Sequence, residues 1–204
     1  MAQLEKQKSK SLLYGLVLAG GKSTRMKVDK SVLHYHGKTQ VEHAVQLLKK
    51  YCDKVFISNR EDQNDLQGHN VAPQIHDQPE FNNIGPIGGI LSAMTTYPGV
   101  SWFILACDLP FVTDKTLQNL INSRNFAKPA TAYISVHDQL PEPLCAIWEP
   151  QIYSLITNFI KQGTLCPRKI LINANANLIS PQQKNALDNI NNPEEYKQAL
   201  RSLK

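Results

Sequence analysis

Two glycines and two cations follow the first apolar run of the sequence. Residues 12–18 are strongly apolar, and Ala19, Gly20 and Gly21 come directly after them, with Arg25 and Lys30 shortly beyond. Glycines let the backbone turn tightly and approach a ligand, and successive N–H groups can hold an anion. An arginine grips phosphate oxygens with a fork of donors, and a lysine neutralises them as a point charge. The stretch therefore indicates a site for a chain of phosphates, with an ordinary turn and a solvated loop as the alternative.

An acidic residue stands at the end of another apolar run. Residues 102–106, WFILA, lead through Cys107 into Asp108. A carboxylate at the end of a buried strand is costly unless it is paired or holds a cation, and a hard carboxylate suits Mg²⁺ shared with phosphate oxygens. The alternative is that Asp108 caps the turn that contains Pro110. We expect a Mg²⁺ site at Asp108.

The sequence lacks the usual pairing of a nucleophile with a base. It has no Gly-x-Ser-x-Gly elbow, and its four cysteines have no CxxC spacing, so we expect reduced and mostly buried thiols. His34 and His36 have no third ligand nearby and are expected to be surface or hairpin residues. An acceptor that already carries a phosphate monoester needs no protein base. The remaining chemistry would be to hold two polyanions in line and to neutralise their charge, as in nucleotidyl transfer.

Apolar runs of strand length alternate with helical patterns along the chain. Such alternation predicts an α/β fold with a mostly parallel sheet covered by helices on both faces, in which ligands bind beyond the carboxyl ends of the strands. The expected strands are 12–18, 54–58, 102–106, 131–136 and 144–148. Helices are expected over the apolar stripes at 41–48 and 152–160. Three more are expected to begin after the N-cap Thr113, at Pro86 and at Pro193.

Composition is that of one globular domain. The chain has 204 residues, 42% of them hydrophobic, and a net charge of +5. We expect a basic N-terminal tail at 1–11 and a single domain at 12–204. Because the sequence has neither a long apolar segment nor a secretory signal, we expect a cytoplasmic protein. Without a distributed basic stripe we expect no nucleic-acid partner, and we expect a monomer or weak oligomer.

Four segments resemble motifs of one enzyme family. The string LAGGKSTRMKVDKSVL at 18–33 resembles the LAGGxSxRMGxDKxxL signature of nucleotidyltransferases of the molybdenum-cofactor guanylyltransferase type, with Lys27 where the family usually has glycine. CDLP at 107–110 resembles the family's CDxP, and GPIGGI at 85–90 resembles its GPLAGM segment. DNINNPEE at 188–195 resembles its N[VI]NTPEE string, although helix capping explains part of that string.

The resemblance implies a three-layer, Rossmann-like nucleotidyltransferase fold and a set of site residues. Arg25, Lys30 and Asp108 would be catalytic, with Asp108 also binding Mg²⁺ and Asp29 orienting Lys30. Asn189 and Asn191 would lie near the acceptor. Gly88 and Gly89 would serve either close packing of helix on sheet or access for the base and ribose. The implied nucleotide-binding residues are Leu18, Ala19, Gly20, Gly21, Lys30, Asp77, Gly85 and Asp108.

The implied reaction is transfer of GMP from GTP to the phosphate of molybdenum-molybdopterin, which gives molybdopterin guanine dinucleotide and pyrophosphate. LAGG favours GTP, because relatives that use CTP tend to have LAAG at this place. Molybdoenzymes or cofactor-biosynthesis proteins are the implied partners. The alternatives are a related nucleotidyltransferase that uses CTP or a sugar or polyol phosphate, and a GTP-binding module without catalysis. The longer GxGTRLxPxT-like loop of sugar-nucleotide enzymes is absent.

Overall fold

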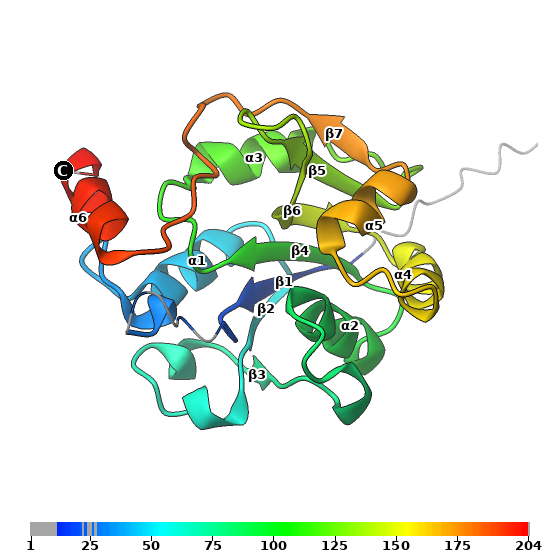
Figure 1. Ribbon diagram of the computed structural model, residues 1–204, viewed down its shortest axis with the longest axis horizontal. Coiled ribbons are helices and arrows are strands. Elements are labelled where there is room, and N and C mark those ends of the chain that lie inside the picture. Colours follow the sequence, from blue (N-terminus) through cyan, green and yellow to red (C-terminus); the bar gives the residue numbers. More distant parts are fainter. Residues whose placement is uncertain (1–11, 22, 24–25, 27, 204) are drawn as a thin grey trace, which may run out of the picture.

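Seven strands form one sheet through the centre of the computed structural model, which describes residues 12–21, 23, 26 and 28–203 (Figure 1). The order across the sheet is β3-β2-β1-β4-β6-β5-β7. In chain order the strands are β1 (Leu13–Leu18), β2 (Lys54–Ser58), β3 (Gln74–Ile75), β4 (Ser101–Ala106), β5 (Ala130–Ile134), β6 (Pro141–Trp148) and β7 (Asn177–Ile179).

Parallel pairing aligns the carboxyl ends of β1, β2 and β4. Leu18, the last residue of β1, lies opposite Ser58 of β2 and Ala106 of β4. Strand β3 continues the parallel set beside β2, and β7 is parallel to β5. Strand β6 runs antiparallel to both β4 and β5. The mostly parallel sheet expected from the sequence is therefore confirmed, and the segments that follow β1, β2 and β4 leave it at one edge.

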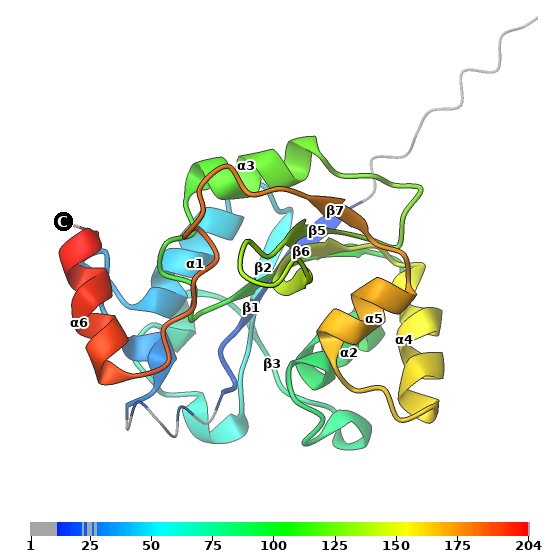
Figure 2. The ribbon, with the colours of Figure 1, turned by 45° about the horizontal axis from the view of Figure 1, so that its top comes forward.

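Helices cover both faces of this sheet (Figure 2). Helices α1 and α3 pack on one face, and α2, α4 and α5 pack on the other. Helix α6 stands at the side of the molecule, as Figure 1 shows. Among the described residues, no helix is both long and apolar enough to cross a membrane. The helices are α1 (Gln40–Leu48), α2 (Pro86–Thr96), α3 (Asp114–Asn122), α4 (Ile152–Lys161), α5 (Pro167–Asn173) and α6 (Pro193–Ser202).

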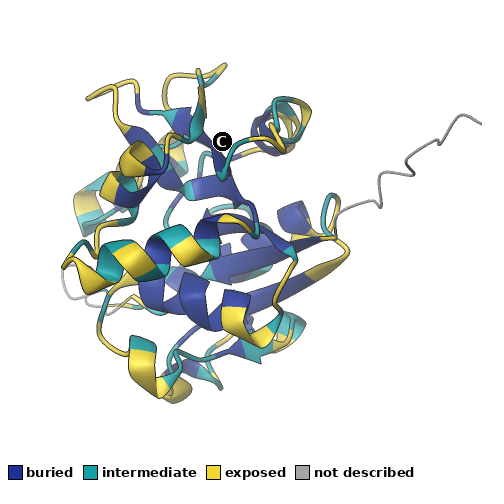
Figure 3. Ribbon diagram, turned by 90° about the vertical axis from the view of Figure 1, so that its right-hand side faces the viewer, coloured by how far each residue is buried: buried dark blue, intermediate teal, exposed yellow. Residues whose placement is uncertain are grey.

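Strand periodicity divides the core into two layers. Leu16 of β1 packs with α2 and α4, whereas its neighbour Val17 packs with α1 and α3. Trp102 and Phe103 of β4 divide between the two layers in the same way. Because successive side chains of a strand point to opposite faces, each central strand is apolar on both sides. Figure 3 shows the result, a buried sheet between helices whose outer faces are exposed.

The structure contains three short elements that the sequence patterns did not predict, and it shows that two of the four cysteines are not fully buried. Strands β3 and β7 have two and three residues, too few for a periodic pattern, and α5 has only seven residues. Of the four cysteines expected to be mostly buried, Cys107 and Cys145 are buried, Cys52 is half-buried and Cys166 is exposed. His34 forms a β-bridge to Thr39 in the turn before α1, as expected for a hairpin residue. The expected tail at 1–11 lies outside the described residues.

A buried ion pair joins the segment after α3 to the end of β6, at the edge of the sheet opposite the carboxyl ends of β1, β2 and β4. The Arg124 guanidinium donates to Glu149 at 2.7 Å and 2.9 Å, and the Ser101 hydroxyl donates to the same carboxylate at 2.7 Å. The Arg124 and Glu149 side chains are only 8% and 3% exposed. Removal of either side chain would leave the other one buried and charged without its ionic partner.

We expect Arg124→Met to lower the free energy of unfolding by about 3–5 kcal/mol, because Glu149 loses its cation. Urea unfolding of the purified protein measures this. The control is Lys50→Met, which removes the exposed pair of Lys50 with Asp114 and should leave the unfolding free energy nearly unchanged. Equal losses in the two variants would contradict the role given to the buried pair.

Candidate functional site

A lysine, an aspartate and an asparagine from distant parts of the chain meet at the carboxyl end of β4. The Lys30 ammonium donates to Asp108 Oδ2 at 3.1 Å and to Asn191 Oδ1 at 2.6 Å. The Lys30 and Asp108 side chains are 18% and 25% exposed, so a ligand can still reach them. The structure thus brings together three of the residues expected at the site.

A short 3₁₀ helix, Lys30–Val32, presents Lys30. Its N-cap is Asp29, whose Oδ1 accepts hydrogen bonds from Ser31 N at 2.9 Å and Ser31 Oγ at 2.7 Å. Asp29 was expected to orient Lys30. The Asp29 carboxylate caps the turn that carries Lys30, whereas the Lys30 ammonium contacts Asp108 and Asn191.

The C-terminal segment is fixed against the same strand end. Ile190 N donates to the Asp108 carbonyl at 3.1 Å, and Asn191 N donates to Glu195 Oε2 at 2.7 Å. Asn192 caps α6 by accepting from Glu195 N at 2.9 Å, so the capping alternative holds for that residue. Asn191 therefore reaches Lys30 from a segment held at both of its ends.

The glycine loop, Ala19–Gly21, leaves β1 beside the end of β2. A Cβ on Gly20 would lie 3.7 Å from the Cα of Asn59, and a Cβ on Gly21 would meet no atom within 4 Å among the described residues. Arg60 Nη1 donates to the carbonyls of Gly20 at 2.6 Å and Gly21 at 3.1 Å. Leu18 is the last residue of β1. The predicted catalytic residue Arg25 lies outside the described residues, as does Lys27.

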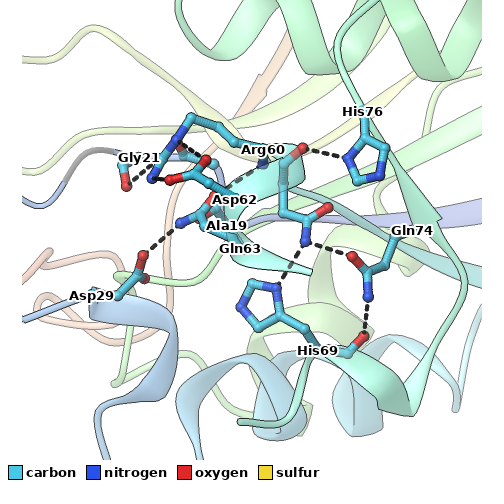
Figure 4. A network of polar contacts seen from close by, with 11 residues as sticks. Ala19, Gly21, Asp29, Arg60, Asp62, Gln63, His69, Gln74 and His76 are labelled. Carbon is cyan, nitrogen blue, oxygen red and sulfur yellow. Dashed lines mark hydrogen bonds and ion pairs between the residues drawn. The ribbon is translucent and has the colours of Figure 1, made fainter. Parts of the chain in front are cut away.

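A buried polar network supports this edge from behind (Figure 4). Asn59 Nδ2 donates to His69 Nδ1 at 3.0 Å and to Gln74 Oε1 at 2.7 Å. Because the Ser31 hydroxyl donates to Asp29, His69 Nε2 must be the donor in its 2.8 Å contact with that hydroxyl. His69 is therefore neutral in this network, and burial lowers its pKa while Asp29 opposes the shift.

Sequence reasoning missed Asn59 and His69. Asn59 is 3% exposed, and its buried Oδ1 has no hydrogen-bond partner within the described part of the chain. It directly follows the apolar run at 54–58, so the rule that selected Ala19 and Asp108 could also have selected it. No comparable signal marks His69.

Asp77 and Gly85 lie beside the first turn of α2. Asp77 follows β3, and burial raises the pKa of its carboxyl. Gly85 is the N-cap of α2 with φ of 70°, a conformation that favours glycine. A Cβ on Gly88 would lie 2.4 Å from the Phe81 carbonyl, and one on Gly89 would lie 2.3 Å from Ser58 Oγ. The glycines of α2 therefore serve close packing, which was one of the two expected roles.

A cavity of about 820 Å³ opens next to Asp108. Its wall includes Glu142 and Pro143 at the start of β6, Arg168 of α5, and Asn189. Arg168 donates to Asp138 at 2.6 Å and to Glu142 at 3.2 Å. Asn189 therefore faces a space large enough for a sizeable organic ligand, whereas Asn191 contacts Lys30.

Asp108 is the carboxylate on which a metal at this site would depend. The described residues contain no group of three or more His, Cys, Asp or Glu side chains that could hold a metal ion. Mg²⁺ commonly uses one or two carboxylates together with substrate phosphates and water. One partly exposed carboxylate beside a lysine fits that mode of binding.

Comparisons with known proteins agree on one family. The model of the MobA-like NTP transferase domain matches residues 15–203. A "Molybdenum cofactor biosynthesis bifunctional protein" of Synechocystis is 40% identical over 190 residues, which are 93% of this chain but only 54% of that relative. The chain thus spans about half the length of this relative. A "Probable molybdenum cofactor guanylyltransferase" of Bacillus cereus is 29% identical, with 93% of this chain and 96% of the relative covered.

Solved structures share the fold. A molybdopterin-guanine dinucleotide biosynthesis protein A from Archaeoglobus fulgidus superposes with a TM-score of 0.71 at 23% identity, covering 93% of this chain and 97% of that one. A nucleotidyl transferase from Methanothermobacter superposes with a TM-score of 0.73 at 15% identity, covering 94% and 97%. The three-layer, Rossmann-like nucleotidyltransferase architecture is therefore confirmed.

The neutral state of His69 predicts a loss of stability in acid. Its folded pKa lies below its ordinary value, so between these two values the unfolded chain binds more protons and stability falls as the pH drops below about 6.5. We expect His69→Gln to reduce the change in unfolding free energy between about pH 7.5 and about pH 5.5, as measured with urea.

The control for this measurement is His137. The hydrogen bond with Asp188 raises the pKa of His137, so the shift is opposite to that of His69 and its contribution to stability grows as the pH falls. His137→Gln should therefore leave the acid loss the same or larger. A His69→Gln protein with the acid loss of the wild type would show that His69 does not titrate as inferred.

Proposed function

This chain belongs to the MobA-like NTP transferase family, and from that membership we propose that it transfers GMP from GTP to the phosphate of molybdenum-molybdopterin, giving molybdopterin guanine dinucleotide and pyrophosphate. The observation that carries the proposal is the position of Lys30. Its ammonium contacts both Asp108, at the strand end where a nucleotide would bind, and Asn191, in the segment next to the large cavity. In the proposed reaction this cation would stand between the nucleotide and the acceptor phosphate.

The proposed reaction needs positioning and charge neutralisation more than a protein base. An oxygen of the acceptor phosphate attacks the α-phosphorus of GTP, the bond from that phosphorus to the β-phosphate oxygen breaks, and pyrophosphate leaves. Because the attacking oxygen is already an anion, no proton has to be removed. Lys30 would stabilise the negative charge that gathers around the α-phosphorus, and this is the kind of electrostatic contribution that speeds such reactions most.

Asp108 would hold Mg²⁺ in this scheme. When bound, the metal would offset the charge of the phosphates and of the leaving pyrophosphate. Asp108 Oδ2 accepts a hydrogen bond from Lys30. A metal held by Asp108 would therefore lie near the Lys30 ammonium, and both positive charges would act on the phosphates.

The cavity supports the acceptor part of the proposal. Asp108, Pro143 and Asn189 line it, and Lys30 contacts Asp108, so a ligand bound there with its phosphate toward Asp108 would place that phosphate near Lys30. Arg168, on the cavity wall, would be available to an anionic acceptor by exchange with Asp138 or Glu142. A nucleotidyltransferase acting with CTP or on a sugar phosphate would use the same edge of the sheet, so the base and the acceptor need direct tests.

We expect Lys30→Met and Asp108→Asn each to reduce turnover by about a hundredfold or more, since each removes a charge from the reacting phosphates. Pyrophosphate release with GTP, Mg²⁺ and purified molybdenum-molybdopterin measures this, and thermal unfolding checks that the variants are folded. Lys38→Met is the matched control, because the Lys38 ammonium contacts only the exposed side chain of Gln46 among the described hydrogen bonds. Near-normal turnover in either site variant would remove the assigned chemistry.

We also expect GTP with Mg²⁺ to raise the melting temperature of the wild-type protein more than CTP or ATP does, because a ligand that binds only the folded state stabilises it according to its affinity. The second glycine of LAGG motivates the choice of GTP. A larger shift with CTP would replace the guanylyl proposal by a cytidylyl one, and equal shifts would leave the family assignment without a preferred base.

A further inference from the structure

Gln63 lies behind the glycine loop with every polar group of its side chain in use. It is 2% exposed. Its Nε2 donates to the Ala19 carbonyl at 3.1 Å and to Asp29 Oδ2 at 2.5 Å, and its Oε1 accepts from Arg60 N at 2.9 Å. An amide side chain has two N–H donors, so both are used here.

These three bonds join three segments that border the candidate phosphate site (Figure 4). Ala19 belongs to the loop that leaves β1, Asp29 caps the 3₁₀ helix that carries Lys30, and Arg60 follows the end of β2. Gln63 therefore fixes the glycine loop and the Lys30 turn relative to one another. A buried, fully bonded side chain is costly to displace, which makes the link rigid.

The bonds to carbonyl groups also determine where the N–H groups of the loop point. In a trans peptide the C=O of one residue and the N–H of the next point in opposite directions. Gln63 holds the carbonyl of Ala19, so the N–H of Gly20 points away from Gln63. Arg60 holds the carbonyl of Gly20 in the same manner, so the N–H of Gly21 points away from Arg60.

Arg60 is itself held in place. Its Nε and Nη2 donate to the two carboxylate oxygens of Asp62 at 2.9 Å and 3.0 Å. Arg60, which donates to the carbonyls of the glycine loop, is therefore itself oriented by Asp62, as a preorganised binding site requires.

We propose that Gln63 is a positioning residue that sets the glycine-loop N–H groups and the Lys30 turn for a nucleoside triphosphate before it binds. The inference rests on the proposed function only in assigning phosphates to this loop. Gln63 does not touch the nucleotide in this scheme. It lowers the free-energy cost of ordering the groups that bind the phosphates, so it strengthens binding of the phosphates and not of the base.

The test compares a ligand with phosphates to one without them. Affinities of the full chain for GTP in Mg²⁺ are measured by calorimetry, and affinities for guanosine by competition. We expect Gln63→Leu to weaken GTP about tenfold or more while guanosine changes by less than about twofold, because only the phosphate-binding groups lose their support. Gln40→Leu is the matched control, since Gln40 is also 2% exposed and its Oε1 has no partner among the described residues.

A second pair of variants separates positioning from a general loss of structure. Gln63→Glu keeps the acceptor for Arg60 N but places a carboxylate against Asp29, so it should weaken GTP at least as much as Gln63→Leu. Addition of Asp29→Asn returns a donor to this contact from the other side, since an asparagine amide can donate to the new glutamate. We expect the double variant to regain part of the lost GTP affinity.

An unchanged ratio of GTP to guanosine affinity in Gln63→Leu would overturn the proposal, and so would a double variant that binds GTP no better than Gln63→Glu. If the wild-type protein prefers CTP, the same comparison is made with CTP and cytidine. In that case the guanylyl proposal fails while the role of Gln63 is still decided. A wild-type protein that binds no nucleoside triphosphate would overturn both.

Discussion

The parallel register of three central strands is the constraint on which the rest of the molecule depends. Leu18, Ser58 and Ala106 lie opposite one another, so the chain must leave β1, β2 and β4 at one edge of the sheet. Hydrogen bonding between strands satisfies the backbone up to that line, and beyond it the polar groups need other partners. Gln63 and Arg60 donate to the carbonyls of the glycine loop, His76 donates to the carbonyl of Asn59, and Ile190 N donates to the carbonyl of Asp108.

Much of this edge can be predicted from the sequence, because strand ends are marked by abrupt changes of residue type. Ala19–Gly21 and Asp108 each follow an apolar run directly, and the structure places them at the same edge. The contact of Lys30 with Asp108 is a consequence of the parallel sheet, although it joins positions far apart in the chain. The family resemblance then directs attention to Asn191, which periodicity alone does not select.

Other features have no local signature. The support for the glycine loop comes from Gln63, whose importance depends on three partners in three separate segments. His69 is buried by tertiary packing, and nothing in its immediate neighbours distinguishes it from a surface histidine. Short elements such as β3 and α5 are fixed by their neighbours in the fold more than by their own propensity, so a pattern search passes over them.

The reversed direction of β6 has a consequence for how such a domain can diversify. Because β6 is antiparallel to β4, the strand start at Pro141 and the connection from β5 to β6 reach the same edge as the carboxyl ends of β1, β2 and β4. The cavity wall next to Asp108 is therefore made in part from a hairpin, whereas the glycine loop comes from a parallel crossover. A hairpin can gain or lose residues without altering the register of the strands it joins. The wall of the cavity can therefore change in length while the parallel register of β1, β2 and β4 stays the same.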